Sequence, residues 1–170
     1  MSINLDLINA RDSGAIFSDD RKYRYLLWRK WNNSNPLCMF IGVNPSVADE
    51  NTDDRTIGRV KSFASGFGFG GVVMSNLYSL IATDPDVLHK QIKTDEGSAI
   101  GLLTDVYLDA AASQCERIYL AYGVDGWRYR RAVDVQNLLK REYWCLGRSK
   151  NGAPRHPLYL KGDTPQELYQ

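Results

Sequence analysis

The sequence is poor in the residues that build metal sites and disulfides, and it has no long apolar run. Its 170 residues include three cysteines, which form no Cys-x-x-Cys pair, and two histidines. We therefore expect no zinc-type ligand cluster, no metal and no cofactor. No stretch approaches the roughly 18 apolar residues of a membrane helix, and the first residues lack the basic and apolar segments of a secretory signal. These absences predict a cytoplasmic protein with no membrane partner.

The charge is balanced overall but uneven along the chain. The net charge is +1, which does not by itself indicate a strong polyanion binder. Residues 1–110 carry 11 basic and 14 acidic side chains, whereas residues 117–161 carry ten basic and three acidic ones. We therefore expect a polyanion such as DNA to contact the C-terminal part.

Short apolar runs alternate with amphipathic segments. Alternation at 23–27 indicates an antiparallel edge strand or hairpin arm, and a longer helix is expected at about 95–113. The pattern predicts one α/β domain over residues 1–170, with three α/β/α layers around a mainly parallel four-stranded sheet. We expect it to act as a monomer. The four buried strands are expected at 37–43, 72–77, 117–122 and 143–146.

In such sheets ligands bind beyond the carboxyl ends of the strands, so the loops there are examined first. Asn44 follows the first buried strand, and its side-chain oxygen can hold a water molecule. Around it, Gly42 allows close backbone approach, and Val43, Pro45 and Ser46 are included as base-binding residues. The alternative is a simple turn with a local side-chain hydrogen bond.

Asn76 ends the second buried strand. Its amide offers a donor and an acceptor on one edge, as needed to read the Watson–Crick edge of a pyrimidine. We include Tyr78, two residues further on, among the base-binding residues. The alternative is an amide that caps neighbouring backbone groups.

His156 lies between two prolines in the sequence Pro154-Arg155-His156-Pro157. A fixed backbone suits an imidazole that donates a hydrogen bond to a leaving base. The following Leu158 and Tyr159 are candidates for insertion into a base stack. The alternative is an arm that packs its apolar residues on the body.

Five basic residues are candidates for phosphate contacts. Arg128, Arg130 and Arg131 stand beside aromatic residues at a helix start, and Lys150 and Arg155 follow in the C-terminal segment. The alternative is a solvated helix face.

Four acidic residues lie between 49 and 54. Asp49 or Asp53 is predicted to act as a general base or to stabilise a cationic sugar. The alternative for this group, which also includes Glu50 and Asp54, is helix capping.

Taken together, three of these motifs resemble those of the uracil-DNA glycosylase superfamily. The segment IGVNPS is similar to the water-activating motif of the mismatch-specific uracil/thymine glycosylases, SNLYSLIATDP to the strand that ends in a pyrimidine-reading Asn, and RHPL to the late His-Pro motif. This resemblance implies that Asn44 positions water, Asn76 reads the base and His156 stabilises the departing base anion.

More closely, the chain resembles a family catalogued as domain of unknown function 1643. That resemblance rests on RYLLW at 24–28, GVNPSVAD, DDRT at 53–56, NLYSLIATDP and GAPRHPLYL at 152–160.

The expected function is a DNA glycosylase that hydrolyses the glycosidic bond of a flipped pyrimidine, in repair or in defence against phage. The acidic loop suggests a hydroxymethylated or glycosylated base as substrate. The alternatives are a non-catalytic nucleotide or modified-base binding module and a hydrolase of small nucleosides or nucleotides.

Overall fold

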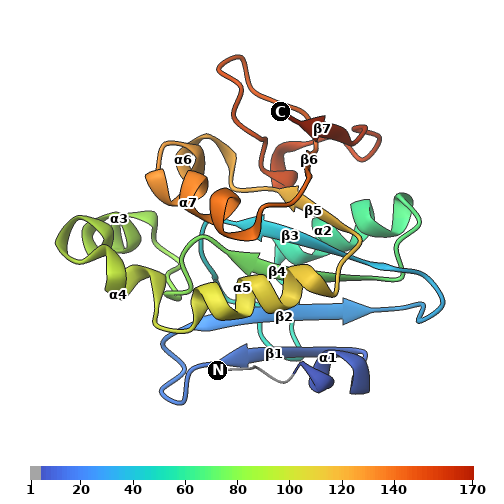
Figure 1. The fold of residues 1–170 in the computed structure, drawn as a ribbon, viewed down its shortest axis with the longest axis horizontal. Helices are drawn as coiled ribbons and strands as arrows, with labels where there is room; N and C mark the ends of the chain where they lie inside the picture. The colour runs from blue at the N-terminus through green and yellow to red at the C-terminus, as the bar shows by residue number, and fades with distance from the viewer. Residues whose placement is uncertain (1–4) are drawn as a thin grey trace.

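A computed structural model describes residues 5–170 and shows a mixed α/β fold around one seven-stranded sheet (Figure 1). The strand order is β1-β2-β4-β3-β5-β6-β7. The strands are β1 (Ser13–Phe17), β2 (Arg24–Lys30), β3 (Leu37–Gly42), β4 (Gly71–Asn76), β5 (Arg117–Leu120), β6 (Tyr143–Cys145) and β7 (Glu167–Tyr169). The helices are α1 (Asp6–Ala10), α2 (Arg55–Gly66), α3 (Pro85–Thr94), α4 (Glu96–Ile100), α5 (Thr104–Ser113), α6 (Gly123–Trp127) and α7 (Arg130–Leu139), with a 3-10 turn, η1 (Pro157–Tyr159).

The sheet is mixed, and it is larger than the predicted four strands with one antiparallel edge strand or hairpin arm at 23–27. The strand found there, β2, lies between β1 and β4 and so is not at the edge. β3 pairs in parallel with β4 and β5, and β5 pairs in parallel with β6. β1, β2 and β7 join by antiparallel pairings at the two sides of the sheet. The apolar runs of β3 and β4 are buried almost throughout, as expected for strands covered on both faces.

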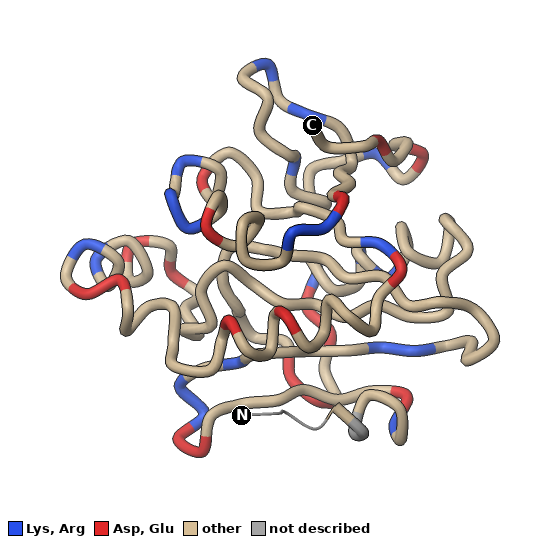
Figure 2. Tube along the Cα trace, in the orientation of Figure 1, with Lys and Arg blue, Asp and Glu red and all other residues tan. Residues whose placement is uncertain are grey.

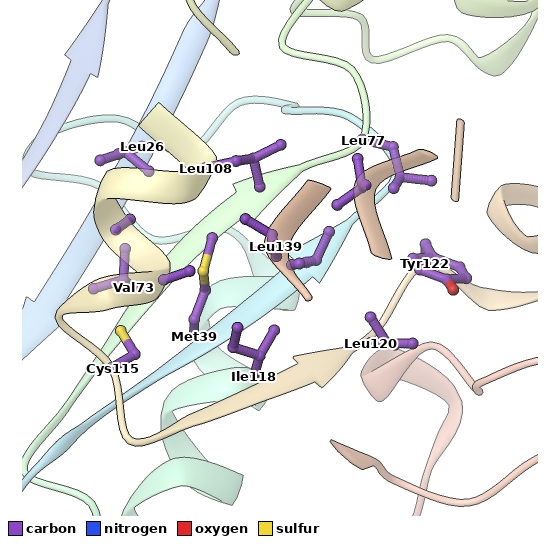
Figure 3. Packing of buried hydrophobic residues seen from close by; sticks show 14 of the residues in the cluster. Leu26, Met39, Val73, Leu77, Leu108, Cys115, Ile118, Leu120, Tyr122 and Leu139 are labelled. Carbon is purple, nitrogen blue, oxygen red and sulfur yellow. The ribbon is translucent and has the colours of Figure 1, made fainter. Parts of the chain in front are cut away.

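Two apolar clusters lie on opposite faces of the sheet. On one face, Leu108 of α5 and Leu139 of α7 pack with Met39 and Val73 (Figure 3). On the other face, α2 contributes Ile57, Val60, Phe63 and Ala64, which pack with the alternate strand residues. The alternation of side chains along each strand therefore supplies both clusters.

The prediction of one continuous helix at 95–113 is wrong, because the segment forms two helices: α4 ends before Gly101 and α5 begins after it. Gly101 has φ +86, and a Cβ atom there would lie 2.7 Å from a ring carbon of Tyr23. A left-handed residue cannot continue an α-helix, so the segment bends at this point.

Two strands were not predicted. β1 includes Gly14, where a Cβ would lie 2.3 Å from the indole of Trp28. Packing against Trp28 therefore requires glycine, a residue that is unfavourable in strands and weakens the strand pattern in the sequence. β7 has only three residues and is held by pairing with β6.

Cys38, Cys115 and Cys145 are free thiols in buried positions, where a thiol packs as a small apolar residue. In the part of the chain that the structure covers, no helix has the length and apolar character needed to span a membrane.

Candidate functional site

A cavity of about 240 Å³ lies at the carboxyl ends of β3 and β4. It brings together Asn44, Asn76 and His156, which the sequence separates by up to 112 positions. Asn44 follows β3, Asn76 ends β4, and His156 lies just before η1 in the C-terminal segment. Figure 1 shows β3 and β4 side by side in the sheet. The full lining is Arg24, Gly42, Val43, Asn44, Ser46, Asp54, Thr56, Ile57, Met74, Asn76, Ala82, Thr83, Pro85 and His156.

Backbone hydrogen bonds continue beyond the strands and hold the two asparagines in place. Leu77 N donates to Gly42 O at 2.9 Å, and Tyr78 N donates to Val43 O at 2.9 Å. Gly42 lies opposite Asn76 in the sheet register, and a Cβ on Gly42 would lie 2.8 Å from Asn76 Oδ1. The glycine therefore allows the amide of Asn76 to lie against the backbone of β3.

Asn76 is 2% exposed, yet its side chain makes no hydrogen bond with any residue that the structure describes. Its Nδ2 is buried without a partner. Buried polar groups in folded proteins are nearly always paired, because an unpaired one costs about 1–3 kcal/mol. The amide therefore does not have the capping role that was its alternative. Asn76 lines the cavity, and its Nδ2 is an unused donor at this site.

Asn44 differs from Asn76 because its nitrogen is fully used. Nδ2 donates to Pro45 O at 2.9 Å and to Ala82 O at 2.8 Å. These two bonds fix the orientation of the amide and leave Oδ1 as its remaining polar atom. An acceptor oxygen with a fixed position suits the binding of a water molecule.

His156 is held as a neutral imidazole with its proton on Nε2. The backbone N–H of Leu158 donates to Nδ1 at 3.2 Å, so the other ring nitrogen carries the proton in the neutral form. Burial lowers the pKa of His156 below its ordinary value of 6.5, and Asp54 opposes this only in part. The ring is therefore an uncharged hydrogen-bond donor at neutral pH.

Two charged residues of the cavity were not predicted as site residues. Arg24 comes from the start of β2 and is 3% exposed. Asp54 caps α2, where its Oδ1 accepts from Ile57 N at 2.9 Å. Asp54 was recognisable as a helix cap. Arg24 begins the family motif RYLLW at 24–28, but the sequence gave this motif no role in a site.

The two acidic residues that were predicted to be catalytic lie outside the cavity lining. Asp49 Oδ1 accepts from two backbone N–H groups of its own loop, which lower its pKa. Asp53 forms ion pairs with Arg29 at 2.8 Å and Lys61 at 2.7 Å. The structure therefore supports local structural roles for both residues, and it leaves Asp54 as the carboxylate of the site.

Two predicted base-binding residues also lie outside the lining. Tyr78 is buried in the core, where its hydroxyl donates to Glu96 at 2.8 Å. Burial and this carboxylate raise the pKa of Tyr78. Pro45 acts through its carbonyl, which accepts from Asn44 and from Ala82 N. Of the other predicted base-binding residues, Gly42, Val43 and Ser46 do line the cavity.

A second cavity of about 400 Å³ adjoins the first and shares Val43 and His156 with it. Arg155 and Tyr159 also line it, together with Asp125. Tyr159 is 77% exposed, whereas Leu158 is half-buried.

The predicted insertion segment therefore has one exposed aromatic residue. The end of the arm packs on the body, as its alternative interpretation held. Leu160 is buried, and its carbonyl accepts from Arg59 of α2.

The predicted phosphate-binding residues fall into two groups. Arg131 is 4% exposed and donates to Leu77 O and to Asp105, so its prediction as a DNA contact is wrong. Arg128 and Arg130 are exposed, although each has an aspartate within 4 Å.

Lys150 and Arg155 are also exposed. Figure 2 shows basic residues near α6 and α7 and on the C-terminal arm, interspersed with acidic ones.

The fold and the cavity define a mixed α/β protein with a polar site at the ends of adjacent parallel strands. A family model described as "Protein of unknown function (DUF1643)" matches residues 24–158, which is most of the chain. The chain belongs to this family, and Asn44, Asn76 and His156 all lie within the matched range. Searches of curated proteins and of solved structures gave no match.

Proposed function

We propose that the protein is a glycosylase that binds a flipped pyrimidine in the cavity of about 240 Å³ and hydrolyses its glycosidic bond. The observation that carries the proposal is the convergence of Asn44, Asn76 and His156 on this cavity, each with a free polar atom. This arrangement is similar to the one that the resemblance to uracil-DNA glycosylases implies.

Each side chain has a role that follows from its free atoms. Asn76 pairs with the Watson–Crick edge of the base through Nδ2 and Oδ1. His156 donates from Nε2 to an oxygen of the base, which becomes negative as the bond from C1′ to the base nitrogen breaks. The electron pair of that bond stays with the base, and the sugar acquires oxocarbenium character.

Water then adds to C1′ from the position set by Asn44 Oδ1. Asp54 supplies the negative charge that stabilises the sugar cation and accepts a proton from the water. The hydrolysis leaves an abasic site and a free base. The second cavity, with Arg155 and Tyr159, is where we place the flanking DNA.

A second candidate is a protein that binds or hydrolyses a small nucleoside or nucleotide. Two observations favour it over a DNA enzyme. Arg131 is buried within the protein, and Arg128 and Arg130 have acidic neighbours, so the basic surface is weaker than the sequence predicted.

The two candidates are tested by incubating the protein with DNA that contains uracil, a mismatched thymine or phage-type modified pyrimidines, and then detecting abasic sites by alkaline cleavage. Asn44→Ala and His156→Ala should abolish cleavage. Asp49→Asn serves as the matched control, because Asp49 lies outside the cavity, and it should retain cleavage. If wild-type protein makes no abasic site in any of these DNAs but binds or hydrolyses free nucleosides, the second candidate replaces the first.

A further inference from the structure

Arg24 lines the cavity, and one hydrogen-bonding edge of its guanidinium has no partner among the described residues. Its Nη1 donates to Ala48 O at 2.6 Å, but its Nε is buried without a partner. Among the residues that the structure describes, Nη2 has no hydrogen-bond partner either. Nε and Nη2 together form the edge with which a guanidinium group binds a carboxylate or phosphate through two parallel hydrogen bonds.

The other two buried arginines show what this edge does when the protein itself satisfies it. In Arg29, Nε donates to Asp53 and Nη2 donates to the backbone. In Arg131, Nε donates to a backbone carbonyl and Nη2 donates to Asp105. Arg24 has a similar degree of burial and lines the cavity, but in the described part of the chain no protein group binds its corresponding edge.

In the described part of the protein no carboxylate forms an ion pair with Arg24 within 4 Å, although the charges of Asp54 and Asp49 act to raise its pKa. Burial lowers its pKa to about 10, which leaves it cationic at neutral pH. Asp54 lines the same cavity, but no ion pair within 4 Å joins the two side chains in residues 5–170. A buried charge without a partner is unfavourable, so the cavity is complementary to an added anion.

We propose that the cavity binds a ligand that carries an oxyanion, a carboxylate or a phosphate, held by Nε and Nη2 of Arg24 beside the amide of Asn76. The proposal deepens the proposed function, on which it rests for the pyrimidine part of the ligand. It differs from the expectation of a hydroxymethylated or glycosylated base, which relied on the acidic loop at 49–54. Of the carboxylates in that loop, the cavity lining contains Asp54 alone. The oxyanion has two sources: an acidic group on the base, or the phosphate of a nucleotide.

The test is a calorimetric titration of the full chain with uracil, uracil-5-carboxylate, deoxyuridine monophosphate and inorganic phosphate. We expect at least one of the acidic probes to bind about tenfold or more tightly than uracil, because a charge-assisted bidentate pair is added. A preference for uracil-5-carboxylate assigns the oxyanion to the base. A preference for the nucleotide or for phosphate assigns it to the phosphate group.

Arg24→Lys retains the charge but loses the planar edge, and it should remove most of the preference. Arg29→Lys is the matched control, since it changes a buried arginine of the same strand whose edge is bound within the protein, and it should retain the preference. Circular dichroism verifies that both variants fold. The ranking of probes by the wild-type protein tests the proposal even where a variant does not fold.

Equal or weaker binding of every acidic probe relative to uracil would overturn the proposal, and so would the absence of binding by all four probes at millimolar concentration. The glycosylase activity is measured separately by the abasic-site assay. Tight binding of an acidic probe without any abasic site would retain the oxyanion site and reject the glycosylase. Cleavage of uracil DNA without any preference for acidic probes would retain the glycosylase and reject the oxyanion site.

Discussion

Asn76→Ala should separate stability from function. The side chain is 2% exposed, and truncation of a buried residue normally destabilises a protein. Here, however, the removed Nδ2 has no partner among residues 5–170, and an unpaired buried polar group costs about 1–3 kcal/mol. The space left behind joins an existing cavity instead of forming a sealed void. We therefore expect the free energy of unfolding to stay unchanged or to rise by up to about 3 kcal/mol.

The neighbouring Ser75 supplies the control. It is equally buried, but its hydroxyl donates to Tyr25 O at 3.0 Å. Ser75→Ala should lower the free energy of unfolding by about 0.5–1.5 kcal/mol, because a satisfied hydrogen bond is lost. In a domain of this size, 1 kcal/mol corresponds to about 2–4 °C in Tm.

Thermal and urea unfolding of the two variants measure the difference directly. Asn76→Ala should also lower glycosidic cleavage by about 10²–10³-fold, as expected for the loss of a preorganised donor in an active site. If Asn76→Ala were as destabilising as Ser75→Ala or more so, the amide would have a structural partner, and the reasoning that assigns it to a ligand would be refuted.

Three further predictions test the surroundings of the cavity. Gly42→Ala places a Cβ 2.7 Å from Met74 Cε and 2.8 Å from Asn76 Oδ1. Urea unfolding should therefore show that the free energy of unfolding falls by about 1–3 kcal/mol, and ligand binding should be lost. The pKa of His156 is below 6.5 in the folded protein, so its contribution to stability is complete above pH 6.5 and is lost as the pH falls from 6.5 towards the lowered pKa. His156→Gln should remove this part of the pH dependence of stability. Thermal unfolding across pH 4–8 measures the effect. Arg131→Ala should lower the free energy of unfolding by about 1–3 kcal/mol, because its bonds to Leu77 O and Asp105 are lost. The salt dependence of DNA binding should stay unchanged. If Arg131 contacted a phosphate, the substitution would reduce the slope of DNA affinity against salt concentration.

The buried strands could be predicted because continuous apolar runs have few other structural solutions. The runs at 37–43 and 72–77 correspond to β3 and β4, and their shared direction follows from the helix between them. β1 and β7 could not be predicted in this way. Each is a short strand whose existence depends on pairing with a partner, which a local pattern does not contain.

The site was predictable where backbone and side chain together define it. The positions of Asn44 and Asn76 at the ends of buried strands, and of His156 between prolines, made them candidates. The residues alone left a turn, a backbone cap and a packed arm as alternatives, and the resemblance to the glycosylase motifs singled the three out. Arg24 and Asp54 were missed because their position at the cavity depends on how β2 and α2 pack against the strand ends.

The sequence gives the position of each charged residue but not whether its hydrogen-bonding groups find partners within the protein. The difference between paired and unpaired groups is what defines the site. Asp53 and Arg29 pair with each other, and Arg131 binds within the core, so their charges serve to hold the fold. Arg24 and Asn76 have the same burial but keep unpaired atoms, and both line one cavity. Since folding tolerates few unpaired buried groups, two of them at one place in the described part of the chain support our proposal that a ligand completes their hydrogen bonds. That molecule must supply acceptors for both the guanidinium and the amide, which is a stricter requirement than complementarity to a pyrimidine edge alone.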